Sequence, residues 1–201
     1  MTIAGFATPE GTARYRSRHG ALPDAAFRRW NDLTLATVGM GTYLGEPDRV
    51  TDKAVEAAAM RCLQGGINVL DTAINYRCQR GERALGAALA ALVKEGALQR
   101  DEIFLSTKGG YIAFDGDHPA DARAYFRDRY LTPGVCRGED VAAGCHCMAP
   151  DYLEHELRVS LRNMGVDTVD LYYVHNPETQ LGEVPRGEFL DRLTRAFERL
   201  E

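Results

Sequence analysis

Four short apolar runs, each followed by a stretch with helical periodicity, constrain the fold of this chain more than any other feature. Each run is nearly continuous rather than alternating, as is typical of strands covered on both faces of a parallel sheet. The runs are LTLATVG at 33–39, INVL at 67–70, EIFLSTK at 102–108 and VDLYYVH at 169–175. Strands that alternate with helices in this way predict an α/β fold with a parallel sheet.

The segments that follow the runs have apolar residues at helical spacing. In the segment 82–96, Leu85, Leu89 and Leu92 fall on one helical face, and Gly96 ends the pattern. The other predicted helices span 51–66, 149–165 and 187–201. Two architectures fit this alternation: an open doubly wound sheet, or part of a (β/α)₈ TIM barrel.

Composition narrows the class of protein. The 201 residues suit a single domain, 1–201, with 45% hydrophobic and 26% charged residues. A net charge of −5 argues against nucleic acid or an anionic membrane as the main partner. The longest apolar run, Ala84 to Val93, is far shorter than the ~20 residues of a membrane span, and no secretory signal is recognisable.

Two parts of the domain lie outside the repeats. Residues 1–32 show no lasting periodicity and are interpreted as an N-terminal extension that includes a short hairpin. Residues 109–150 form a long loop insertion between the third strand and the third helix, with a predicted helix at 119–131. We expect this insertion to lie over the rim of the sheet.

The insertion contains a stretch rich in cysteine and histidine. Its members are Cys136, Cys145, His146 and Cys147. A metal site is one interpretation, but the CHC triplet is tight for one tetrahedral zinc and the outer spacing matches no familiar zinc pattern. We therefore expect no metal and ordinary free thiols. Five irregularly spaced cysteines in total favour a reduced, cytoplasmic chain.

Polar side chains follow the predicted strands at their carboxyl ends. They are, in chain order, Gly41 and Thr42, Asp71 with Tyr76 in the loop after it, Lys108, and His175. Each has an ordinary structural explanation when taken alone, such as a turn former for Asp71 or a snorkelling surface side chain for Lys108. Ligands bind at this end of the strands in both parallel architectures, so their joint placement predicts an active site.

The chemistry of these groups is complementary. An unperturbed tyrosine hydroxyl titrates near 10, and a nearby ammonium favours its ionised form. Tyr76 is therefore predicted to be a general acid tuned by Lys108, with Asp71 keeping the lysine charged. His175 is predicted to donate a hydrogen bond to a substrate carbonyl.

Four segments resemble, in order and at suitable separations, the successive strand ends of the aldo-keto reductases. They are VGMGTYLG, NVLDTAINY, FLSTK and DLYYVHNP, and RGERALGAAL is similar to the helix start that follows the Asp…Tyr segment of the family. The resemblance covers roughly residues 33–201. It implies a (β/α)₈ barrel that reduces an aldehyde or ketone, or oxidises the alcohol, by hydride transfer with NADP(H) or, as the alternative, NAD(H).

The resemblance also implies roles for individual residues. The catalytic tetrad of the family falls on Asp71, Tyr76, Lys108 and His175. The first-strand loop near the nicotinamide end of the cofactor falls on Gly41, Thr42 and Tyr43, and Asp71 is assigned to the same cofactor site. The expected partner is a small carbonyl or alcohol.

Only four of the eight β/α units of such a barrel are expected in this sequence. The strand-7 and strand-8 loops that hold most of the cofactor phosphates in the family would then be absent. We therefore expect residues 1–201 alone to bind NADPH weakly or not at all, and to self-associate through open sheet edges.

Two alternative interpretations of the sequence remain open at this point. GMGTYLG after the first strand mimics the fingerprint of a Rossmann-type dinucleotide-binding domain, but its third glycine comes one place late. Asp71 also lies about 30 residues beyond Gly39, where that fingerprint prefers roughly 20. The second alternative is a non-catalytic, reductase-like fragment that acts in binding or assembly.

Overall fold

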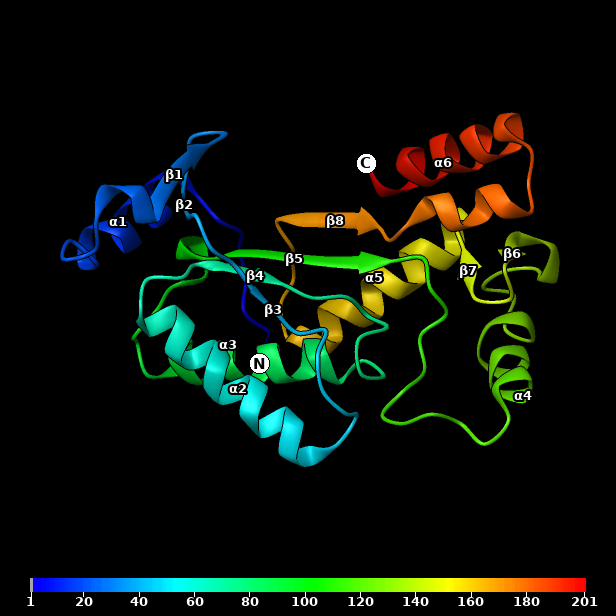
Figure 1. Ribbon diagram of the computed structural model, residues 1–201, viewed down its shortest axis with the longest axis horizontal. Coiled ribbons are helices and arrows are strands. Elements are labelled where there is room, and N and C mark those ends of the chain that lie inside the picture. Colours follow the sequence, from blue (N-terminus) through cyan, green and yellow to red (C-terminus); the bar gives the residue numbers. More distant parts are fainter. Residues whose placement is uncertain (1) are drawn as a thin grey trace.

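A four-stranded parallel sheet forms the centre of the computed structural model, which describes residues 2–201 (Figure 1). The strands lie side by side in chain order, β3-β4-β5-β8. Their bounds are Met40–Gly41 for β3, Val69–Asp71 for β4, Phe104–Gly109 for β5 and Leu171–Val174 for β8. This confirms the predicted parallel α/β fold.

Four helices connect and follow these strands. They are α2 (Arg49–Gln64), α3 (Arg80–Lys94), α5 (Pro150–Met164) and α6 (Arg186–Leu200). Each contacts the next along the chain, α2 with α3, α3 with α5, and α5 with α6. Strands and helices thus advance in one direction, as they do in a segment of a barrel. A dinucleotide-binding sheet reverses its strand order near the first strand, so the observed order contradicts the Rossmann alternative. No closed barrel occurs within the described residues.

Local signals explain where these helices begin and end. Asp48 caps α2, since its Oδ1 accepts a hydrogen bond from the backbone N–H of Thr51 at 2.7 Å. At the carboxyl end of α5, Gly165 takes the left-handed conformation with φ +67°, which stops the helix after Met164. The main core packs α2, α3 and α5 against β4 and β5 through buried leucines such as Leu70 and Leu105.

The predicted first strand, 33–39, does not join the parallel sheet. Leu33–Ala36 forms β2, which pairs antiparallel with β1 (Phe27–Trp30) in the expected hairpin, and only the short β3 joins the parallel sheet. The prediction of one strand over 33–39 was therefore wrong. Asn68 holds the hairpin against the sheet, because its Oδ1 accepts from Ala36 N at 2.8 Å. An apolar run does not itself reveal which neighbour it pairs with.

The N-terminal extension contains a helix that the sequence analysis missed, α1 (Pro9–Arg18). Thr8 caps it and Pro9 is its first residue, a recognisable start signal. Tyr15 is fully buried and donates a hydrogen bond to the backbone oxygen of Leu63 at 2.6 Å. In Figure 1, α1 and the hairpin lie at the amino ends of the strands, away from the predicted active site.

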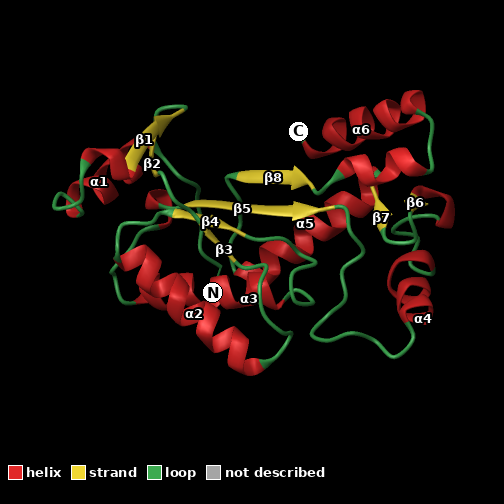
Figure 2. Cartoon of the chain, in the orientation of Figure 1, coloured by secondary structure: helices red, strands yellow, loops and turns green. Residues whose placement is uncertain are grey.

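The insertion lies at the opposite end, beside the carboxyl ends of β5 and β8 (Figures 1 and 2). It contains α4 (Ala122–Phe126), a π-helical turn at Arg127–Leu131, and two short strands that pair, β6 (Val141–Ala142) and β7 (His146–Cys147). The predicted helix at 119–131 is thus confirmed over most of its length.

The insertion is packed rather than loose. Tyr130 and Cys147 are fully buried in an apolar cluster with Tyr152 and Leu153 of α5. Because burial of apolar surface is what stabilises such a segment, the insertion is part of the domain core at this end. Among residues 2–201, no helix is long and apolar enough to cross a membrane.

Candidate active site

The carboxyl ends of β4 and β5 bring Asp71 and Lys108 into contact. The Lys108 ammonium donates to Asp71 Oδ2 at 2.6 Å and to the backbone oxygen of Thr72 at 2.7 Å. Ser106, two residues before Lys108 and on the same face of β5, donates to the other carboxylate oxygen of Asp71 at 2.8 Å. The lysine side chain is only 14% exposed. Its charge is therefore held in place by two oxygen partners.

Tyr76 lies over the same ammonium. Its hydroxyl oxygen is 3.5 Å from Lys108 Nζ, and Nζ lies 5.0 Å from the centre of the tyrosine ring. The loop that carries Tyr76 continues through Arg77, which has a left-handed backbone with φ +49°. The Arg77 guanidinium is buried and bonds to Asp52 of α2 at 2.9 Å. This ion pair ties the tyrosine loop to the adjacent helix.

His175 follows β8 and faces Tyr76. The two ring centres are 5.6 Å apart, and the ring of Tyr111 contacts His175 from another side at 5.2 Å. Burial lowers the pKa of His175, and the positive charge of Lys108 lowers it further. The imidazole is therefore neutral near pH 7 and can donate one ring N–H to a ligand.

Two adjoining hollows open above these residues and share Tyr76, His175 and Asn176. One, of about 370 Å³, is also lined by Asp71, Lys108, Tyr173 and Val174. The other, of about 520 Å³, is also lined by Tyr43, Asn75 and Tyr111. The buried Oδ1 of Asn75 has no hydrogen-bond partner among residues 2–201, so it can accept a hydrogen bond from a ligand.

The three residues predicted from the first-strand loop occupy different environments. Gly41 pairs in register with Asp71, and the exposed Tyr43 ring packs 5.1 Å from the Tyr76 ring. Thr42 is buried, and its hydroxyl is 2.7 Å from that of Thr72. Tyr43 and Gly41 therefore lie beside the site, whereas the Thr42 side chain packs beneath it. Their role in cofactor binding stays a prediction.

Sequence reasoning missed several residues of this site. Ser106 had a detectable signal, because strand alternation places it on the same face as Lys108. Asn75 and Tyr111 had none, since both lie in loops whose path is set by distant contacts. The backbone oxygen of Tyr111, for example, accepts from the Tyr152 hydroxyl at 2.9 Å.

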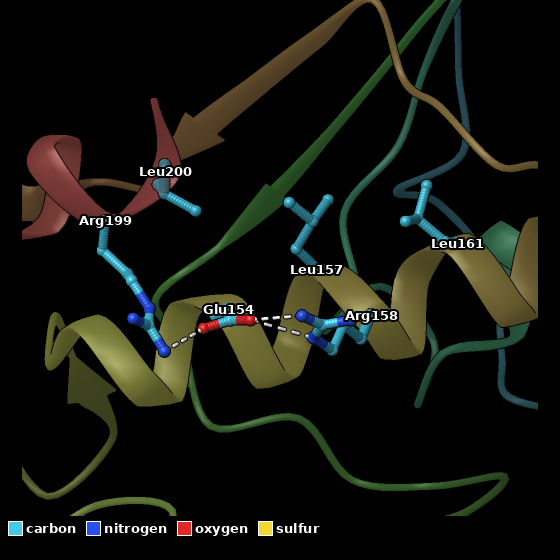
Figure 3. A pocket seen from close by; sticks show the side chains of 6 residues that line it. All are labelled: Glu154, Leu157, Arg158, Leu161, Arg199 and Leu200. Atoms are coloured by element: carbon cyan, nitrogen blue, oxygen red, sulfur yellow. Dashed lines mark hydrogen bonds and ion pairs between the residues drawn. The ribbon is translucent and has the colours of Figure 1, made fainter. Parts of the chain in front are cut away.

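A separate hollow of about 400 Å³ lies between α5 and α6 (Figure 3). Its charged residues are already paired with one another, since Glu154 bonds to both Arg158 and Arg199. Leu157, Leu161 and Leu200 line the rest of it. Because its charged side chains bond to one another, this hollow is a weaker candidate for the active site than the strand ends.

The cysteine- and histidine-rich stretch makes its contacts within the protein. Both ring nitrogens of His146 are occupied, one by the backbone oxygen of His175 and the other by the side chain of Gln180. Among residues 2–201, no group of three or more His, Cys, Asp or Glu side chains is arranged to hold a metal ion. All five cysteines are free thiols, as expected.

Comparisons with known proteins identify a family and several relatives of this chain. Residues 37–199 match the Aldo/keto reductase family. A curated relative, the 6-dehydroglucose reductase of Agrobacterium fabrum, is 28% identical over 162 residues, which cover 80% of this chain and 46% of the relative. The NADH-specific methylglyoxal reductase of Escherichia coli is 26% identical over 152 residues, covering 72% of this chain and 39% of the relative.

A comparison with solved structures shows a similar fold. An aldo-keto reductase from Bacillus halodurans superimposes with a TM-score of 0.54 and 24% identity, covering 88% of this chain and 46% of that protein. The chain thus spans less than half the length of these relatives. On the family match and the strand-end residues together, this chain belongs to the aldo/keto reductase family.

Proposed function

We propose that this protein reduces an aldehyde or ketone with a nicotinamide cofactor, and that Tyr76 is the general acid. One observation carries the proposal: a single ammonium, Lys108, contacts both the Asp71 carboxylate at 2.6 Å and the Tyr76 hydroxyl at 3.5 Å. A cation at this position stabilises negative charge on the tyrosine oxygen after it gives up its proton.

The roles of the residues follow from their contacts. The nicotinamide, when bound, supplies the hydride. Tyr76 donates its hydroxyl proton to the carbonyl oxygen as negative charge develops there. His175, kept neutral by burial, donates a hydrogen bond to the same oxygen and holds it within reach of Tyr76. Asp71 and the Thr72 carbonyl fix the ammonium that stabilises the product tyrosinate.

The hollow beside Tyr76 fits a flat ligand with an amide group. Its lining combines the aromatic rings of Tyr43, Tyr76 and Tyr111 with the free acceptor of Asn75. These residues would hold the nicotinamide end of the cofactor. The relatives are described as reductases of 6-dehydroglucose and of methylglyoxal, the latter specific for NADH. A small polar carbonyl is therefore the substrate class that we propose, with NADP(H) or NAD(H) as cofactor.

We also propose that the four β/α units form half of a (β/α)₈ barrel in the active protein. The sequential strand order and the helix contacts of α2, α3, α5 and α6 support this arrangement. The reading frame beyond Glu201 tests it, because four further strand–helix units are expected there.

The function itself is tested by Tyr76→Phe in the form of the protein that reduces aldehydes. Loss of the proton donor should lower kcat by ~10²–10⁴-fold while the affinity for NADPH, measured by fluorescence, stays the same. Retention of more than about a tenth of the wild-type kcat would exclude Tyr76 as the acid.

A further inference from the structure

The insertion reaches the candidate active site through one buried histidine. His146 begins β7 and is fully buried, and its Nε2 lies 2.7 Å from the backbone oxygen of His175. Because a carbonyl oxygen only accepts, Nε2 must carry the hydrogen and donate it. The next residue, Cys147, donates its backbone N–H to the oxygen of Gly110 at 2.7 Å and so fixes β7 against the end of β5.

The second ring nitrogen of His146 determines its tautomer. The amide nitrogen of the buried Gln180 lies 3.1 Å from Nδ1. The amide oxygen of Gln180 accepts from Arg192 at 3.2 Å, and a guanidinium can only donate. This contact orients the amide so that its N–H groups face Nδ1. His146 is therefore the neutral Nε2–H form, in agreement with a pKa that burial lowers.

A glycine makes the close approach of His146 to His175 feasible. A Cβ at Gly110 would lie 2.7 Å from His146 Nε2 and 3.2 Å from the backbone oxygen of His175. Gly110 also has φ +138°, which other residues rarely adopt. Any side chain at this position would separate the two histidines.

The hydrogen bond from His146 anchors the backbone of His175 on its carbonyl side. On one side of this residue, its N–H donates to the oxygen of Gly109 at 2.7 Å, and on the other its carbonyl accepts from His146. The chain then turns sharply at Asn176, which has φ +45°. Without the His146 hydrogen bond, only the N–H side of His175 would be anchored before the turn.

We propose that His146 is a positioning residue for His175. Its Nε2–H holds the His175 carbonyl, and thereby keeps the imidazole directed at the carbonyl oxygen that Tyr76 protonates. This inference rests on the proposed function, because it gives the insertion a role in carbonyl reduction. Gln180 acts in the same chain of contacts by holding His146 in the donating tautomer.

The first test does not depend on activity. Long-range ¹H–¹⁵N NMR of histidine-labelled protein, assigned with His146→Gln, should show His146 as the neutral Nε2–H tautomer at pH 7. The Gln180→Met variant, which keeps the side-chain length but removes the amide, should weaken this preference. An Nδ1–H tautomer or a charged ring in the wild-type protein overturns the proposal.

The second test is kinetic and uses para-substituted benzaldehydes as probes. His146→Phe keeps the ring and removes the donor, so kcat should fall roughly 10- to 100-fold, as expected for a displaced catalytic group. NADPH affinity should not change. The rate should also depend more steeply on electron withdrawal by the substituent, because a displaced His175 no longer stabilises charge on the carbonyl oxygen. His146→Gln, whose amide can replace the donor, should recover part of the loss.

His118→Phe is the matched control, since this exposed histidine of the same insertion does not contact His175. It should leave the kinetics unchanged. Equal losses for all benzaldehydes in His146→Phe would indicate a merely structural role and overturn the proposal. A wild-type protein that reduces no carbonyl even with a complete barrel overturns the proposed function and with it the positioning role of His146 in carbonyl reduction. The NMR result still decides whether His146 holds the His175 carbonyl.

Discussion

Glu156 should make the stability of this domain fall as pH rises toward neutrality. The residue belongs to α5, is only 1% exposed, and its Oε2 has no hydrogen-bond partner among residues 2–201. Burial and the nearby carboxyl of Glu82 raise the pKa of Glu156 to about 8. The folded protein therefore keeps this carboxyl protonated at pH 7, while the unfolded chain ionises it.

The sign and size of the effect follow from this difference. Below pH 4.5, the ordinary pKa of the group, both states are protonated and Glu156 costs nothing. Above it the unfolded state releases its proton first, so stability falls until about pH 8, where the folded state also ionises. At ~1.4 kcal/mol per pH unit the full loss is at most ~5 kcal/mol, of which about 2.5 kcal/mol falls between pH 5 and pH 7.

The perturbation is Glu156→Gln, which has nearly the same shape and cannot ionise. The free energy of unfolding is measured by urea denaturation at pH 5, 6 and 7 and should fall less for the variant than for the wild type. The difference in this free energy between the two proteins should grow by ~2.5 kcal/mol from pH 5 to pH 7. Titrating groups that do not interact with Glu156 are common to both proteins and cancel in the difference.

Glu154→Gln on the same helix is the control. Its ion pairs with Arg158 and Arg199 lower the pKa of Glu154, so it stays ionised in both states over this pH range. The difference in free energy of unfolding between Glu154→Gln and the wild type should be nearly the same at all three pH values. Stability curves of Glu156→Gln and wild type that run parallel from pH 5 to pH 7 would refute the burial of a protonated carboxyl in α5.

Two further predictions concern the site and the sheet edge. Lys108→Met should lower kcat more than Asp71→Asn does, because the Thr72 carbonyl still holds the ammonium when the carboxylate is lost. Steady-state kinetics of both variants test this prediction, and a larger loss of kcat in Asp71→Asn would contradict it. The chain 1–201 should self-associate through β8, whose only strand neighbour among residues 2–201 is β5 and whose Tyr173 is 45% exposed. Sedimentation velocity should detect this association and its weakening by Tyr173→Lys, and a monomer at every concentration would argue against it.

Much of the site could be predicted because its residues occupy repeated positions. Asp71 is the last residue of β4 and Lys108 is the second-last residue of β5, and neighbouring parallel strands end at the same edge of a sheet. Their contact at 2.6 Å therefore follows from two local patterns, although 37 residues separate them. The apolar periodicity that predicted the helices is equally local, and for this reason the α/β alternation was correct.

Other features depend on contacts that no local pattern contains. The apolar run at 33–39 was expected to form one parallel strand, yet Asn68 and the residues of β1 direct its first half into a hairpin. The helix α1 was overlooked because few of its side chains are apolar, and its position depends on Tyr15 bonding to Leu63.

The sequence by itself determined the alternation of parallel strands and helices from residue 67 onward, because strand and helix periodicity are properties of short segments. It also determined that Asp71, Lys108 and His175 lie at or just after the ends of these strands. The tertiary structure alone decided how these residues are held. His146 was considered in the sequence only as a metal ligand, and its ring instead bonds to His175, 29 residues away, through a gap left by Gly110. Such contacts arise when separate segments pack together, and the packing depends on the whole chain rather than on either segment.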